Sequence, residues 1–201
     1  MPSYPGPYVP VPPGAPAAAP GGGLIGVGIA GAALQTLAVG VTFLSPGGAA
    51  LGLHATADLL LLLGALGLLR RRQSMLWLLC AIGFGVSLFL SGVLRALSAF
   101  GPGAGVSLLY SLLGLADGAI YALLGLTLLI RCHDGHPGLG IAAGVLAFAR
   151  AGASAALAAM PLLSFLGPDL MRSTMYGWRL SAAALGVLLA VFFGTALGRR
   201  R

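Results

Sequence analysis

Six long apolar segments, separated by proline or arginine, constrain this sequence more than any other feature. Each is about 20 residues long, the length that a helix needs to cross the ~30 Å hydrocarbon layer of a bilayer. The segments are residues 24–44, 51–69, 75–97, 106–130, 139–160 and 178–198. A membrane β-barrel would instead show alternating segments of about ten residues. The sequence therefore predicts an all-α membrane protein, a bundle of six transmembrane helices.

The composition excludes a soluble fold. Charged residues make up 7% of the 201-residue chain and hydrophobic residues 58%. A soluble protein carries about 25% charged residues, because its surface faces water. The sequence has no Glu, which removes any H-E-x-x-H zinc site, and its two cysteines, Cys80 and Cys132, form no C-x-x-C motif. We expect no enzymatic activity, no catalytic residues and no cofactor.

Prolines indicate where the helices end and where a separate tail lies. Eight of the 13 prolines fall within the first 20 residues, and the rest lie between the predicted helices, where proline breaks no helical hydrogen bond. Residues 1–23 are predicted to be a disordered Pro/Gly/Ala-rich tail, and residues 24–201 the transmembrane domain. The tail repeats the P-x-x-P spacing that docks on aromatic-lined grooves. A plain flexible tail and a docking segment for a protein partner are both compatible with it.

The arginines indicate an orientation in the lipid bilayer. Seven lie at one set of segment ends and two, Arg172 and Arg179, at the other. The seven are Arg70, Arg71, Arg72, Arg131, Arg199, Arg200 and Arg201. Cytoplasmic loops carry an excess of basic residues, so both termini are predicted to be cytoplasmic. Because the arginines mark segment ends rather than one basic face, we expect no nucleic-acid binding.

Two further patterns concern the membrane itself. Trp77, Tyr176 and Trp178 lie near segment ends and are predicted to belong to the aromatic belts at the membrane surfaces. The preference for Arg over Lys, with abundant Ala, Gly, Leu and Pro, is typical of a GC-rich bacterial genome. The predicted location is therefore a bacterial cytoplasmic (inner) membrane.

Ionisable residues inside the apolar segments are the candidate functional residues, since each costs roughly 2.5–3.5 kcal/mol at a helix centre. They are His54, Asp58, Arg95, Asp117 and Arg150. Asp117 and Arg150 lie at matching depths, about 17 and 15 Å from the same membrane surface at ~1.5 Å per residue. We predict an ion pair between them and a second one between Asp58 and Arg95.

Polar and small residues accompany these groups at helical spacing and predict one continuous polar seam. Its members are His54, Asp58, Arg95, Asp117, Tyr121 and Arg150. In one interpretation the pairs are structural, and the protein is a non-enzymatic membrane component that assembles partners through its tail and helix faces. In the alternative, Asp58, Asp117, Arg95 and Arg150 serve a small-solute, ion or proton transporter or channel. A chain of 201 residues is short for a monomeric transporter, so that alternative predicts a homo-oligomer.

One polar loop contains residue types that bind zinc or copper. Cys132, His133 and His136 are nearly adjacent in the sequence. Adjacent residues do not all converge on one ion, and the sequence has no second cluster. We therefore predict a polar turn rather than a metal site.

Overall fold

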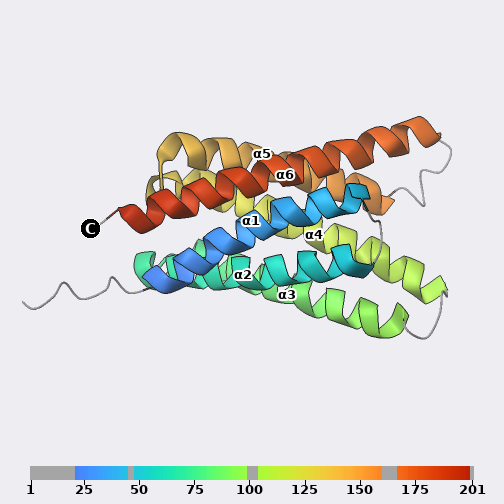
Figure 1. Ribbon diagram of the computed structural model, residues 1–201, viewed down its shortest axis with the longest axis horizontal. Helices are drawn as coiled ribbons and strands as arrows, with labels where there is room; N and C mark the ends of the chain where they lie inside the picture. Colours follow the sequence, from blue (N-terminus) through green and yellow to red (C-terminus); the bar gives the residue numbers. More distant parts are fainter. Residues whose placement is uncertain (1–20, 45–47, 99–103, 160–166, 200–201) are drawn as a thin grey trace, which may run out of the picture.

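The computed structural model describes residues 21–44, 48–98, 104–159 and 167–199. These residues form six long helices and one 3₁₀ turn, and all six helices are long and apolar enough to cross a membrane (Figure 1). The elements are α1 (Gly22–Leu44), α2 (Gly48–Arg72), α3 (Met75–Ser98), α4 (Ala104–Ile130), η1 (Cys132–Asp134), α5 (Pro137–Ala159) and α6 (Pro168–Gly198). The prediction of an all-α fold with six helices able to span a membrane is confirmed. Residues 1–20 of the predicted tail, Arg200 and Arg201 lie outside the described residues, whereas Gly22 and Gly23, also predicted to be tail, belong to α1.

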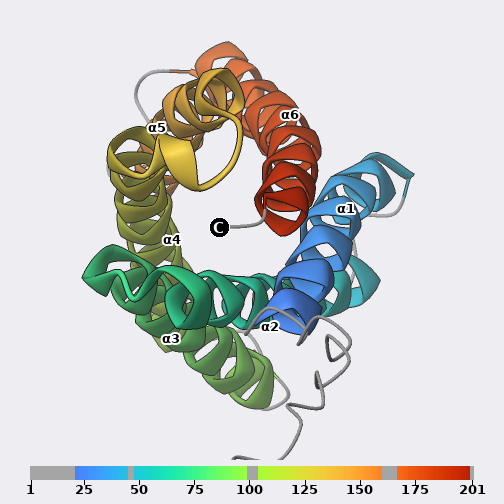
Figure 2. The same cartoon turned by 90° about the vertical axis from the view of Figure 1, so that its left-hand side faces the viewer.

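The six helices form a closed ring in chain order. Each helix packs against its neighbours in the sequence, and α1 also packs against α6. Viewed along the helices, the ring is plain in Figure 2, with α4 and α5 across from α1. A ring of six helices has an interior that side chains must fill, and this interior holds the polar residues described below.

The outer surface of the ring is apolar. Large hydrophobic side chains point outward on every helix, and Phe89 and Leu180 are 70% and 68% exposed. The charged residues of the described spans instead face inward or lie near helix ends. This reverses the pattern of a soluble protein and matches a surface covered by lipid, where helices satisfy their own backbone hydrogen bonds. The length and apolar character of the six helices are consistent with a polytopic membrane protein.

The helix ends lie within three residues of the predicted boundaries, except for the start of α6, which lies ten residues earlier. Residues 168–177, expected to be part of a loop, form the first turns of α6, with Pro168 at the first helical position. Proline suits that position because its missing N–H has no helical partner there. Arg70, Arg71 and Arg72 were expected in a loop but form the last turn of α2, where their charges favour the negative helix end.

Glycines permit close crossings between neighbouring helices. A Cβ on Gly64 of α2 would lie 2.5 Å from the Cα of Gly28 on α1, so no larger residue fits there. Between α4 and α5, a Cβ on Gly118 would lie 3.1 Å from the carbonyl oxygen of Ala151. Lipid provides no hydrophobic driving force for contact between helices, so membrane helices associate through close van der Waals packing. Small residues at the crossings permit this packing.

The arginine-rich end of the ring, where α2, α4 and α6 finish, is closed by η1 and a buried aspartate. Asp134 Oδ2 accepts hydrogen bonds from Trp77 Nε1 at 2.9 Å and from Arg131 Nε at 3.2 Å. Its Oδ1 lies 3.5 Å from Arg72 Nε. Trp77 was predicted to lie in an aromatic belt, but it is fully buried and packs against Phe192 and Phe193. That prediction was wrong, because the indole N–H finds its polar partner inside the protein.

Candidate functional site

Arg150 lies at the centre of the ring and organises the polar residues around it. Its side chain comes from α5 and is buried, with Nη2 3.6 Å from Asp117 Oδ1 on α4. The structure thus contains the Asp117–Arg150 pair that the depth of the two residues predicts. The guanidinium carbon also lies 3.6 Å from the centre of the Tyr121 ring and 5.5 Å from that of Trp178. Aromatic faces attract a guanidinium through their electron density.

Gln35 of α1 completes the surroundings of the arginine. With its amide oxygen facing the guanidinium, Gln35 accepts hydrogen bonds from Arg150 Nη1 and Nη2 at 2.5 and 2.9 Å. This orientation follows from chemistry, since the opposite one would set donors against donors. The amide also lies 3.4 Å from the Tyr121 hydroxyl. Helices α1, α4, α5 and α6 therefore all hold the same buried cation.

A chain of hydrogen bonds fixes the carboxylate of Asp117. Ser154 donates to Asp117 Oδ2 at 2.6 Å, and Trp178 Nε1 donates to the Ser154 hydroxyl at 2.9 Å. Ser154 lies one helical turn beyond Arg150, so α5 presents a positive group and a hydroxyl to the same aspartate. Trp178 was predicted to lie in a membrane-surface belt. It points into the ring instead, because α6 begins ten residues earlier than expected.

A partly open cavity of about 240 Å³ lies beside these groups, in the half of the ring away from the arginine-rich end. Its lining comes from every helix except α1. The polar and aromatic members are His54, Asp58, Ser87, Ser91, Tyr110, Asp117, Arg150, Ser154 and Trp178. Towards this end the helices spread apart, as α6 diverges from α3 and α4 in Figure 1.

Asp58 and His54 occupy the wall of the cavity that α2 provides. Ser87 of α3 donates a hydrogen bond to Asp58 Oδ2 at 3.2 Å. The His54 ring lies 5.9 Å from the Trp178 ring, and its Nε2 is buried without a hydrogen-bond partner among the described residues. The side chain of Arg95 lies outside the described part of the structure, so the Asp58–Arg95 pair stays a prediction.

The polar seam of the sequence analysis is thus largely gathered in one place. His54, Asp58, Asp117 and Arg150 line the cavity, and Tyr121 lies under the guanidinium. Ser154 and Trp178 were not among the predicted site residues. The spacing of four between Arg150 and Ser154 could have indicated the serine, because residues four apart share a helix face.

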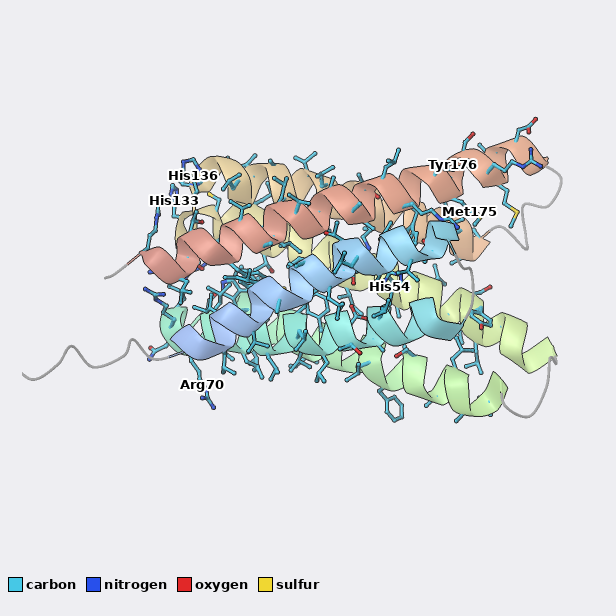
Figure 3. All side chains as sticks on the ribbon, in the orientation of Figure 1. His54, Arg70, His133, His136, Met175 and Tyr176 are labelled. Atoms are coloured by element: carbon cyan, nitrogen blue, oxygen red, sulfur yellow. The ribbon has the colours of Figure 1, made fainter. Side chains whose placement is uncertain are left out.

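The cysteine–histidine loop forms no metal site in the described structure. No group of three or more His, Cys, Asp or Glu side chains in the described ranges is placed to hold a metal ion. Figure 3 shows His133 and His136 at the arginine-rich end, far along the bundle from His54. Instead, the loop binds the end of α6, since Arg199 donates to the His133 carbonyl oxygen and Thr195 accepts from the His136 N–H.

Comparisons with known proteins add no relative. No protein-family model, no curated protein and no solved structure matches the chain. The candidate site is a cavity between apolar helices, lined by two carboxylates, one guanidinium and one imidazole from the three helices α2, α4 and α5.

Proposed function

We propose that the protein is a non-enzymatic transporter of a small solute. The observation that carries this proposal is the cavity of about 240 Å³ on which His54, Asp58, Asp117 and Arg150 converge. Ionisable residues are expensive inside a membrane, and when they face a cavity they commonly mark a solute or ion pathway. A purely structural ion pair needs no cavity beside it.

The two halves of the ring suggest which step of transport this arrangement represents. The half that contains the cavity is partly open and holds the ionisable side chains of His54, Asp58 and Asp117. The other half is filled by buried residues such as Trp77, Leu128 and Phe192 and is closed by Asp134. The layer of Gln35 and Arg150 separates the halves. We infer a state open on one side, which must alternate with a state open on the arginine-rich side.

Labelling of introduced cysteines tests this proposal in membrane vesicles of both orientations. The background carries Cys80→Ala and Cys132→Ser, because these are the two natural cysteines. Ser91→Cys reports on the cavity, and Leu128→Cys reports on the closed half, where Leu128 is 0% exposed. We expect a membrane-impermeant maleimide to label position 91 from the arginine-poor side. We expect slower labelling of position 128 from the arginine-rich side.

The outcomes separate transport from the alternatives. Labelling of position 91 without any labelling of position 128 would describe a cavity with one entrance and would contradict transport. Protection of both positions would mean that the polar groups only stabilise the helix contacts, as the assembly interpretation expects. That interpretation also relies on the proline-rich tail, and deletion of residues 2–20 should leave the labelling unchanged if the protein is a transporter.

The location and orientation remain part of the proposal. The excess of arginine at one end supports the placement of both termini in the cytoplasm. The preference for Arg over Lys, with abundant Ala, Gly, Leu and Pro, supports a bacterial cytoplasmic membrane. Assembly into a homo-oligomer is also part of this proposal. A reporter fused after Arg201 that is active only in the cytoplasm tests the orientation, and its inactivity would reverse the sides assigned above.

A further inference from the structure

The charges of the described side chains that line the cavity do not balance. Asp117 is paired with Arg150, whereas among the described side chains Asp58 has a hydrogen bond from Ser87 and no ion pair. Two carboxylates against one guanidinium leave one negative charge when both aspartates are ionised. An uncompensated carboxylate inside a membrane is costly, and a proton or a bound cation relieves that cost.

The surroundings of Asp58 suit an organic cation better than a bare metal ion. His54, one helical turn before Asp58, has a buried Nε2 that lacks a partner among the described residues. The rings of Trp178 and Tyr110 lie in the same lining, and aromatic faces attract ammonium groups. A divalent metal ion would require several oxygen ligands around it, and no such cluster exists in the described ranges.

The volume of the cavity and its apolar lining limit the size and the polarity of the uncharged part of the ligand. Leu113, Leu157 and Ala55 supply hydrocarbon surface next to the polar groups. The volume of about 240 Å³ lies below the ~300–1,000 Å³ of sites for drug-sized ligands, so the ligand is smaller than those. It combines one charged group with a compact apolar body.

We propose that the transported solute is a small monovalent organic ammonium ion, with its charged nitrogen against Asp58 and its apolar body against Leu113, Leu157 and Trp178. This inference rests on the proposed transport function and adds the chemical class of the substrate. The Arg150 guanidinium, held by Asp117 and Gln35, faces the same cavity and excludes a second positive charge. The site therefore favours monovalent over divalent cations.

Binding to the purified full-length protein in detergent tests the class of ligand. The cationic probes are benzylammonium and benzyltrimethylammonium, and phenylacetate is the anionic probe of similar size. Trp178 lines the cavity and supplies the fluorescence signal, which Trp178→Phe should abolish. We expect saturable binding of the cations. Asp58→Asn should weaken it by more than about tenfold, since a charged contact in a buried site is lost. The control Asp169→Asn, at an exposed residue of α6, should bind as the parent does.

Several results would overturn the inference. Saturable binding of phenylacetate but not of the cations would refute the charge assignment while leaving the labelling test of transport intact. If Asp58→Asn bound the cations as tightly as the parent does, the Asp58 carboxylate would not be part of the binding site. Cation binding that appears only in Arg95→Gln would show that Arg95 already neutralises Asp58. No saturable binding of either cation at millimolar concentration would leave a proton as the ion at Asp58 and would refute an organic substrate cation.

Discussion

Removal of either charge from the Asp117–Arg150 pair should destabilise the protein, and removal of both should cost less than the sum. At 3.6 Å, two unit charges attract by about 5 kcal/mol for an effective dielectric constant of about 20. The loss of one member of a buried pair typically costs ~3–5 kcal/mol, since the other charge stays behind. The structure places the two single variants at different points of that range.

Asp117→Asn should fall near the lower end, about 3 kcal/mol. The new amide still accepts the hydrogen bond from Ser154, and Arg150 keeps Gln35 and the Tyr121 ring as partners. Arg150→Gln should fall nearer to about 5 kcal/mol, because it removes the charge, the two hydrogen bonds to Gln35 and the contact with Tyr121. The double variant leaves neutral amides and should show a coupling energy of about 1–3 kcal/mol.

Thermal unfolding of the four proteins in one detergent, followed by circular dichroism, measures the cycle. Asp169→Asn and Arg172→Gln are matched controls at exposed residues of α6 and should stay within about 0.5 kcal/mol of the parent. Additive effects of Asp117→Asn and Arg150→Gln would show that the two charges do not interact. Single variants as stable as the parent would refute the whole argument, because the guanidinium would then not need its counter-charge.

Three further predictions concern the packing and the closed end. Gly64→Ala should lower the melting temperature, because its Cβ would lie 2.5 Å from the Gly28 Cα, whereas Gly26→Ala meets nothing within 4 Å and should be neutral or slightly stabilising; equal behaviour of the two variants would refute the close crossing. Trp77→Phe should cost about 1–3 kcal/mol in the same unfolding assay, since the buried partner of the indole N–H loses a hydrogen bond, and an unchanged melting temperature would contradict this. Dialysis against zinc followed by elemental analysis should find no stoichiometric metal in the parent or in His133→Ala, and one zinc per chain that His133→Ala removes would refute the structural role of that loop.

Much of the fold follows from the sequence, because few backbone conformations are stable in lipid. An apolar run of about 20 residues must satisfy its backbone internally, and a helix does so. The start of α6 was harder to predict, since residues 168–177 contain Arg172, Thr174 and Gly177 and resemble a loop in composition. Pro168 was the available signal, because proline favours the first position of a helix.

The part of the candidate site that could be predicted is the part that depends only on how deep a residue lies within its helix. Asp117 and Arg150 lie on helices that are neighbours in the sequence, and their predicted depths are similar. These two facts, together with their opposite charges, predict that the side chains form an ion pair. The inward turn of Trp178 was not predictable, because it depends on the start of α6. The burial of Asp134 was not predictable either, since the contact with Trp77 joins residues 57 positions apart.

The order of the helices in the ring has a consequence for how the protein enters the membrane. Asp117 and Arg150 belong to the consecutive helices α4 and α5, and Asp58 and Ser87 belong to α2 and α3. Asp58 and Asp117 therefore each have a partner in the next helix to be synthesised, and the α4–α5 hairpin can leave the translocon with the charge of Asp117 already matched. The ring itself closes only when α6 arrives beside α1. Until then the arginine lacks Trp178, and a ribosome-bound chain of five helices would present an unfinished interior to the surrounding lipids.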